Sequence, residues 1–412
     1  MTSRKTIAIL HYSYPPVVGG VEFIIKGQAE ILAKNGYRIK IITSQGETKN
    51  RGIQIDLIPE IGSGWPENKL VTEELEQGII SERFQRLRGI IYAKIKRSLE
   101  GVKVCLAHNV MTMHFNLALT SALDEIIDGL HHKIRFYLWC HDATLINPDY
   151  SVEHSDRHPW NLLRNFKQNA TYIAISEWRK KQLVQLFGVS ENLIRVIPDG
   201  IDIKTFLRIS DSVWKMACDK GIFDDDLVML FPSRILKRKN YELAIRITKE
   251  LASLGKKCKL LITAPPDPHN PAAKKYYRYL HHLVEEMELK NHVLFLSDLA
   301  SKYELEMGYQ ELQDLYRISD LLLITSSQEG FGIPLLEAAA MKLPLACSEI
   351  PPLSEITKER ALLFKLDDKP FHIARQIIEY LDTQPTYFMF RRIVSRFSWE
   401  AIYQDYLKGL VS

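Results

Sequence analysis

Cysteine is scarce in this sequence, and its placement excludes two common uses. The five cysteines among 412 residues are scattered, odd in number and never spaced as CxxC. This favours a reduced, intracellular protein without a disulfide framework or a thiolate zinc site. No apolar run reaches about 18 residues, and the first residues do not resemble a signal-peptide core. We therefore expect a cytoplasmic protein without a membrane span.

Neither sign of charge dominates. The chain has 54 Lys and Arg residues against 50 Asp and Glu residues, a net charge of +4. That balance does not indicate nucleic-acid binding. There is no internal repeat, no low-complexity tract and no GxGxxG fingerprint, so a dinucleotide cofactor is not indicated. With 46% hydrophobic residues, the composition instead predicts a globular protein of two or three domains.

The most informative stretch joins an apolar run to a helix through a turn that contains two glycines. Residues 321–325 are typical of a buried parallel strand, and a proline shortly afterwards is placed to begin a helix. Gly330 and Gly332 allow a tight turn and close approach of an anion to the helix N–H groups. Glu329 and Glu337 flank this turn, and each can hold a pair of sugar hydroxyls. The alternative is a solvated acid at Glu329 and a helix-dipole partner at Glu337.

A basic turn follows the strand predicted at 227–231. In Pro232-Ser-Arg-Ile-Leu-Lys-Arg-Lys-Asn240, Arg234 and Lys239 are placed to reach a diphosphate. Arginine offers phosphate a bidentate fork, and lysine offers a point charge. The alternative is a solvated basic turn.

The first half of the chain begins with a predicted βαβ unit. Strands at 6–10 and 38–43 enclose a helix, and Gly19 and Gly20 lie in the first turn, where doubly wound sheets bind phosphate. Four polar residues close two later predicted strands and should emerge at the same carboxyl edge: His108, Asn109, His141 and Asp142. A lone histidine at such a position is most often a hydrogen-bonded structural residue.

A resemblance to a known family rests on several of these motifs. Glu329-Gly-Phe-Gly-Ile-Pro-Leu-Leu-Glu337 resembles the glutamate-x7-glutamate signature of retaining GT-B-type glycosyltransferases, group 1 or family 4. Arg234 and Lys239 match the family's Gly-Arg-x-x-x-x-Lys pattern, with Ser233 in place of the glycine. Ile197-Pro-Asp-Gly-Ile-Asp202 is similar to the family's Ile-Pro-Asn-Gly-Ile-Asp segment, with Asp199 where asparagine is commoner.

The resemblance implies a role for each of these residues. Glu337 would hold the donor ribose and Glu329 would hold hydroxyls of the donor sugar. Arg234 and Lys239 would stabilise the departing diphosphate. The predicted catalytic residues are Arg234, Lys239, Glu329 and His141; the predicted donor-binding residues are Gly19, Gly20, Phe331, Gly332, Ile333 and Glu337; the predicted acceptor-binding residues are His108, Asn109 and Asp142.

The alternation of strands and helices predicts an α/β protein with two doubly wound, Rossmann-like domains. By the resemblance, the domains face a cleft: 1–205 forms the acceptor side, 206–395 forms the nucleotide-sugar donor side, and 396–412 is a helix that crosses back to the first domain.

The function predicted from this resemblance is retaining transfer of a hexosyl group from a nucleoside-diphosphate sugar, with GDP-mannose or UDP-glucose favoured. The acceptor would be a hydroxyl of a glycan, a glycolipid or a small polyol. No metal or other cofactor is expected. The alternatives are a sugar-nucleotide epimerase or phosphorylase on the same fold, or a non-catalytic sugar-nucleotide-binding protein.

Two further segments give less specific predictions. Residues 72–102 predict a long helical region, and apolar residues at helical spacing with many cations make 83–99 amphipathic and basic. Such a helix packs on the sheet or, alternatively, lies on the inner face of an anionic membrane as a peripheral contact. Four prolines in 264–271 predict a stiff loop to which no chemistry is assigned.

Overall fold

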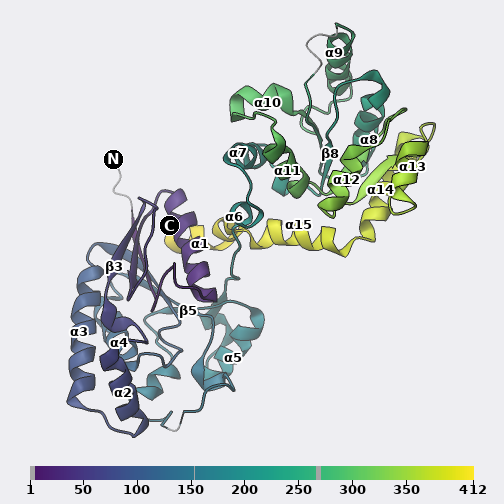
Figure 1. The fold of residues 1–412 in the computed structure, drawn as a ribbon. Helices are drawn as coiled ribbons and strands as arrows, with labels where there is room; N and C mark the ends of the chain where they lie inside the picture. The colour runs from purple at the N-terminus through teal and green to yellow at the C-terminus, as the bar shows by residue number, and fades with distance from the viewer. Residues whose placement is uncertain (1–4, 153, 266–270) are drawn as a thin grey trace. The chain divides into compact units, whose positions relative to one another are not determined.

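The computed structural model describes residues 5–152, 154–265 and 271–412, and the chain forms two compact units (Figure 1). The first unit is Met1–Asp202 together with Phe397–Ser412, and the second is Ile203–Arg396. The sequence analysis predicts that the first domain ends at residue 205, and the structure divides the two units after Asp202. Residues 266–270, which include most of the predicted proline-rich loop, lie outside the described residues.

The first unit contains a seven-stranded parallel sheet in the order β3-β2-β1-β4-β5-β6-β7. Its strands are β1 (Thr6–Leu10), β2 (Arg38–Thr43), β3 (Ile53–Leu57), β4 (Val102–His108), β5 (Arg135–Cys140), β6 (Thr171–Ala174) and β7 (Ile194–Val196). Its main helices are α1 (Gly20–Lys34), α2 (Pro66–Glu76), α3 (Glu82–Ser98), α4 (Leu117–Leu130) and α5 (Glu177–Phe187), with α16 (Trp399–Ile402) and α17 (Lys408–Val411) from the C-terminus.

Both faces of this sheet are buried, because alternate residues of each strand pack against different helices. On β1, Ala8 and Leu10 join a core with α3 and α4, whereas Ile7 and Ile9 join a core with α1 and the C-terminal segment. Trp399 fits closely against α1: a Cβ atom on Gly27 would lie 1.9 Å from the Trp399 indole nitrogen. The C-terminal segment is therefore part of the first unit's core.

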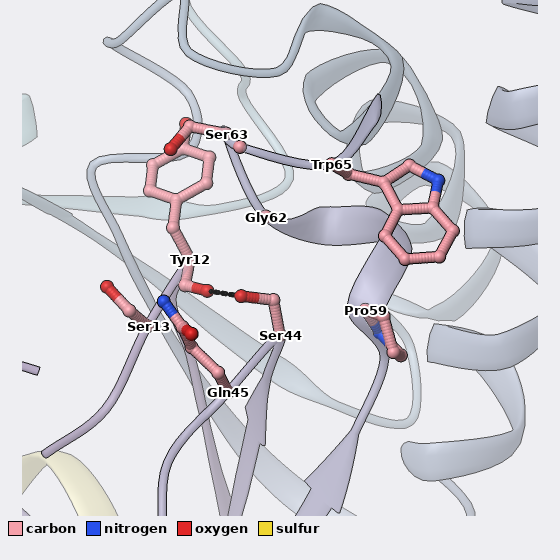
Figure 2. Close-up of a pocket in the computed structure, with 9 residues that line it drawn as sticks. Tyr12, Ser13, Ser44, Gln45, Pro59, Gly62, Ser63 and Trp65 are labelled. Carbon is pink, nitrogen blue, oxygen red and sulfur yellow. Dashed lines mark hydrogen bonds between the residues drawn. The ribbon is translucent and has the colours of Figure 1, made fainter. Parts of the chain in front are cut away.

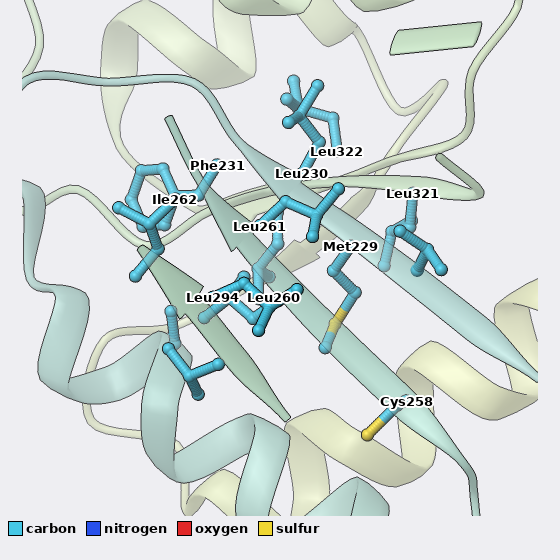
Figure 3. Packing of buried hydrophobic residues seen from close by; sticks show 14 of the residues in the cluster. Met229, Leu230, Phe231, Cys258, Leu260, Leu261, Ile262, Leu294, Leu321 and Leu322 are labelled. Atoms are coloured by element: carbon cyan, nitrogen blue, oxygen red, sulfur yellow. The ribbon is translucent and has the colours of Figure 1, made fainter. Parts of the chain in front are cut away.

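The second unit contains a six-stranded parallel sheet in the order β10-β9-β8-β11-β12-β13. The strands are β8 (Leu227–Phe231), β9 (Cys258–Ile262), β10 (Val293–Phe295), β11 (Leu321–Ile324), β12 (Leu345–Ser348) and β13 (Leu362–Phe364). The helices include α7 (Asp211–Asp219), α8 (Tyr241–Ser253), α9 (Pro271–Glu286), α10 (Leu296–Tyr303), α11 (Tyr309–Ile318), α12 (Ile333–Ala340), α13 (Pro351–Thr357), α14 (Pro370–Asp382) and α15 (Pro385–Phe397). Figure 3 shows side chains of four adjacent strands packed into its core. The prediction of two Rossmann-like domains is confirmed.

Each sheet reverses its strand order at one place. In the first unit the reversal lies between β1 and β4, and in the second it lies between β8 and β11. Loops at the carboxyl ends of such strand pairs leave a crevice where doubly wound sheets bind ligands. The loops that follow β1, β4, β8 and β11 carry most of the predicted site residues.

The helical prediction for 72–102 is corrected to two helices. Helix α2 ends before Gly78, which has a φ of 77°, and α3 begins after Ser81, whose hydroxyl accepts a hydrogen bond from the Phe84 N–H. A glycine in the left-handed region and a serine N-cap are ordinary signals for ending one helix and beginning the next.

The apolar face of helix α3 packs inside the first unit. Phe84, Leu87, Ile91 and Ile95 are buried, so this stripe is not available to lipid. Four of the cations pair with acids of the same unit: Arg83 with Glu74, Arg86 with Glu67, Arg88 with Glu125, and Lys94 with Glu60. The packed-helix interpretation is confirmed for this face. Among the described residues, no helix combines the length and apolar character needed to cross a bilayer.

Candidate active-site residues at two switch points

In the second unit, the loops after β8 and β11 are fastened to each other. The Thr325 hydroxyl donates to the carbonyl oxygens of Lys239 and Asn240 at 3.1 and 2.8 Å, and the Ser327 N–H donates to the Arg238 carbonyl at 2.8 Å. Strands β8 and β11 are neighbours in the sheet, so their loops leave the same edge. These bonds bring the predicted basic turn and the glutamate turn together.

Lys239 and Glu329 form the centre of this site. The Lys239 ammonium lies 2.5 Å from Glu329 Oε1, and the side chain of each is only 10% exposed. The Ser326 hydroxyl donates to the same carboxylate oxygen at 2.7 Å, and Arg238 lies 3.3 Å from the other oxygen. Burial disfavours the charge of Glu329, but the hydrogen bonds from Lys239 and Ser326 outweigh it, and the pKa of Glu329 lies below its ordinary value. The carboxylate is therefore ionised at neutral pH.

Arg234 differs from Lys237, Arg238 and Lys239, each of which forms an ion pair. Its side chain is exposed, and its guanidinium has no hydrogen-bond or ion-pair partner among the residues that the structure describes. Arg238, which the sequence analysis did not single out, binds the Gln328 carbonyl as well as Glu329. Among the described residues of these two loops, Arg234 is the cation that a ligand can reach without breaking an ion pair.

The start of α12 presents backbone N–H groups at the same loop. Gly332, the residue before the helix, has a φ of 119°, and no side chain caps the helix there. A Cβ atom at Gly332 would lie 2.8 Å from a Leu353 methyl group, so the turn requires glycine both for its conformation and for space. Phe331 and Ile333 on either side are exposed. Glu337, one turn into the helix, accepts a hydrogen bond from the Tyr316 hydroxyl at 2.7 Å.

In the first unit, the switch point between β1 and β4 is built from histidines. His11 follows β1, and its Nδ1 lies 3.0 Å from the carbonyl oxygen of His108 at the end of β4. His11 Nε2 lies 3.8 Å from Glu22 on α1, and the Ser13 hydroxyl donates to Glu22 at 2.6 Å. These two neighbours lower the pKa of Glu22 to about 2, against the effect of burial. The ionised Glu22 occupies the space beside Gly19, where a Cβ atom would lie 2.0 Å from its carboxylate.

His108, a predicted acceptor-binding residue, lies inside the first unit, so contact with an acceptor stays a prediction that its surroundings do not favour. Its side chain is completely buried, and both ring nitrogens are engaged: Nε2 with Gln28 and Nδ1 with His141, each at 3.0 Å. Burial is the main reason that its pKa lies well below the ordinary value, so the ring is neutral. His108 supports His141 from inside the protein.

Asn109 and Asp142 also have structural partners. Asn109, at a φ of 62°, accepts hydrogen bonds from the N–H groups of His141 and Asp142 at 2.8 and 3.2 Å, which fixes the turn after β5. Asp142 accepts from the Asn147 amide at 2.6 Å and lies 3.1 Å from Arg179. Asn109 is buried and Asp142 half-buried. Contact of either with an acceptor stays a prediction.

A pocket of about 290 Å³ lies at the carboxyl ends of β1, β2 and β3 (Figure 2). None of the three predicted acceptor residues lines it. None of the lining residues is charged, and polar side chains lie among aromatic residues, proline and glycine: Tyr12, Ser13, Ser44, Gln45, Pro59, Gly62, Ser63, Gly64 and Trp65. The Ser44 hydroxyl donates to the Tyr12 carbonyl, the bond drawn in Figure 2. The arrangement suits a ligand that offers hydroxyl groups.

Family models match both units. Residues 18–205 match the model described as Glycosyltransferase Family 4, and residues 213–393 match the model described as Glycosyl transferases group 1. The chain belongs to the group 1 glycosyltransferases. Its two-domain Rossmann-like architecture is the GT-B fold that the resemblance implied.

This glycosyltransferase is 26% identical over 363 residues to an uncharacterized glycosyltransferase of Methanocaldococcus jannaschii, covering 85% of this chain and 82% of the relative. It is 33% identical over 130 residues to the O-antigen chain mannosyltransferase RfbU of Salmonella typhimurium, covering 31% and 34%. It is 26% identical over 180 residues to a D-inositol 3-phosphate glycosyltransferase of Kineococcus radiotolerans, covering 43% and 39%. The chain thus matches less than half the length of the last two relatives.

Three residues near the ends of the first unit's strands escaped the sequence analysis. Ser44 and Gln45 directly follow the predicted strand 38–43, and the same rule that selected His108 would have found them. Gln28 could also have been found from the sequence. It lies at helical spacing on the same face as the apolar residues Ile25, Ala29 and Leu32, and all four are buried. A polar residue on a buried face requires a partner.

Proposed function

We propose that this glycosyltransferase moves a hexosyl group, with retention of configuration, from a nucleoside-diphosphate sugar to a hydroxyl group of a glycan, a glycolipid or a small polyol. The observation that carries the proposal is the site after β8 and β11. There Arg234, which is exposed and whose guanidinium has no partner among the described residues, accompanies an ionised Glu329 and the open N-terminus of α12. Cation and N–H groups suit a diphosphate, and a carboxylate suits sugar hydroxyls.

The departing diphosphate gains negative charge as its bond to the sugar breaks, and fixed positive groups lower the barrier to that step. We propose that Arg234, Lys239 and the α12 N–H groups supply this stabilisation without a metal. Glu329 holds the sugar hydroxyls while its charge keeps Lys239 in place. Glu337, oriented by Tyr316, is proposed to hold the ribose.

The names of two relatives guide the choice of donor. One is an O-antigen chain mannosyltransferase and another is a mannosylfructose-phosphate synthase. GDP-mannose is therefore the first donor to test, and UDP-glucose is the second.

We propose that the acceptor binds the first unit's pocket between the ends of β1, β2 and β3. Serine hydroxyls and the Gln45 amide can exchange hydrogen bonds with a polyol. No lysine or arginine is among the lining residues, which favours a neutral hydroxyl-bearing group over a phosphate in this pocket.

Shortening Gln45 to alanine is expected to raise the KM for the acceptor roughly tenfold, the equivalent of about one to two hydrogen bonds. The KM for the donor should stay the same, because Gln45 is proposed to contact the acceptor alone. Steady-state kinetics with each substrate varied in turn measures this. Gln54→Ala is a matched control, because Gln54 is exposed on β3 and does not line the pocket. A Gln45→Ala variant with an unchanged acceptor KM would remove the pocket from the proposal.

The stereochemistry of the product tests the reaction class. An α-linked donor sugar should give an α-linked glycoside, as read from the anomeric signals in the NMR spectrum of the isolated product. A β-linked product would contradict retention. Conversion of the donor to another sugar nucleotide without acceptor would favour an epimerase, and a requirement for free phosphate would favour a phosphorylase.

A further inference from the structure

Four side chains of the first unit form one series of polar contacts from the interior to the surface, of which the first two contacts are hydrogen bonds. Gln28 Oε1 lies 3.0 Å from His108 Nε2, and His108 Nδ1 lies 3.0 Å from His141 Nε2. His141 Nδ1 lies 3.4 Å from Asp199 Oδ2. Gln28 and His108 are completely buried, whereas the Asp199 side chain is 27% exposed. They come from α1 and from the ends of β4, β5 and β7.

The protons of this series are linked, because a neutral imidazole donates from one nitrogen and accepts at the other. If the Gln28 oxygen faces His108, His108 donates to it, and His141 must then donate from Nε2 to His108. His141 Nδ1 would face the Asp199 carboxylate with a lone pair unless the ring took up a second proton. If the Gln28 amide is turned, its nitrogen donates to His108, His108 donates to His141, and His141 donates from Nδ1 to Asp199.

The chemistry of Asp199 determines in which of the two directions the hydrogen bonds of the series run. An ionised carboxylate only accepts hydrogen bonds, whereas the oxygen and nitrogen of the Gln28 amide can exchange places without changing its shape. With one proton on each imidazole, only the second direction gives every contact of the series one donor and one acceptor. Asp199 Oδ1 is buried with no hydrogen-bond partner in the part of the chain that the structure describes, so His141 is the contact that orients this carboxylate.

We propose that Asp199 is a positioning residue that fixes His141 in its Nδ1–H tautomer, with donors running from Gln28 through His108 and His141 to Asp199. The importance of this for catalysis rests on the proposed function and on the prediction from the family resemblance that His141 is catalytic. The direction of the hydrogen bonds does not rest on it. Arg179 and Asp142 form a charged pair beside the turn that carries His141. This pair is the same for either direction of the hydrogen bonds.

The test is the tautomer of His141, read from ring ¹⁵N chemical shifts of histidine-labelled protein. The wild type is expected to show a protonated Nδ1 and an unprotonated Nε2. In Asp199→Asn, the amide can also donate, so both directions become available and the reverse tautomer should appear. In the double variant Asp199→Asn, Gln28→Glu, the carboxylate that only accepts hydrogen bonds lies at position 28, the buried end of the series. The direction of every hydrogen bond in the series should then reverse. Asp149→Asn, an exposed site in the same unit, is the matched control.

Kinetics supplies the second readout. Asp199→Asn is expected to lower kcat roughly ten- to a hundredfold, as loss of groups that orient reactive side chains does. The melting temperature and the donor KM should stay near those of the wild type. A wild-type His141 protonated at Nε2 alone would overturn the proposal, and so would an unchanged kcat in Asp199→Asn. If the wild type transfers no sugar, the proposed function fails, while the NMR result still decides the direction of the series.

Discussion

Replacing Arg234 with alanine is expected to lower kcat for sugar transfer roughly 10²- to 10³-fold, the loss typical when one charge-stabilising donor is removed. The melting temperature should not change. Arg234 is exposed and bonds to none of the described residues, so its removal leaves no buried group without a partner. Its positive charge is available only to a ligand at the edge where β8 and β11 end.

The matched control is Arg246→Ala. Arg246 is also an exposed arginine of the second unit, but it lies on α8 and outside the loops after β8 and β11. We expect its kcat to equal that of the wild type. Arg234→Lys should recover part of the activity, because lysine keeps the charge but lacks the bidentate fork. Wild-type turnover in Arg234→Ala would remove Arg234 from the site.

Glu329→Gln should lower both turnover and stability. Glutamine cannot neutralise Lys239, whose side chain is only 10% exposed, and an almost buried cation without its partner costs about 1–3 kcal/mol. The loss of a charged acceptor for the sugar hydroxyls should reduce kcat by a further factor of roughly 10². Activity assays and thermal unfolding measure the two effects separately.

The stability effect of Glu329→Gln should depend on pH with a definite sign. The pKa of Glu329 is lower in the folded protein than its ordinary value of 4.5, so ionisation stabilises the folded state. This contribution is complete above pH 4.5 and is lost as the pH falls through the lowered pKa. The difference in melting temperature from the wild type should therefore be full at pH 7 and shrink in acid. A difference that grew in acid would contradict the pairing with Lys239.

A double variant separates the charge pair from the carboxylate itself. Combining Lys239→Met with Glu329→Gln removes both charges, so much of the stability lost in either single variant should return. Turnover should not return, because both groups are proposed to contact the donor. Recovery of turnover would show that the pair acts only on folding.

The fold was predictable because each buried strand is a short apolar run followed by a polar turn and a helix. Two strands for which the sequence analysis gave no segment, β3 and β13, lie at sheet edges. Strand β3 has the sequence Ile-Gln-Ile-Asp-Leu, with only its first residue buried, and β13 is three residues long. An edge strand buries less surface, so its apolar signal is weaker.

The surroundings of a candidate site residue were predictable where they depend mainly on the motif that contains the residue. Glu329 and Lys239 belong to adjacent strand-to-helix turns, and the structure brings them into contact. His108 follows a strand in the same way, but its exposure depends on Gln28, which lies 80 residues earlier in the chain. Local pattern places a residue at an edge of the sheet, whereas packing between distant segments decides whether a substrate can reach it.

Release of nucleoside diphosphate by the purified protein tests the central claim most directly. A panel of sugar nucleotides that includes GDP-mannose and UDP-glucose is assayed without acceptor and then with pools of glycans, glycolipids and polyols, with and without EDTA. We expect release from one donor, an increase with one acceptor pool, no effect of EDTA, and a large decrease in Glu329→Gln. Tight binding of a sugar nucleotide without release from any donor and acceptor combination would contradict the account and indicate a binding protein.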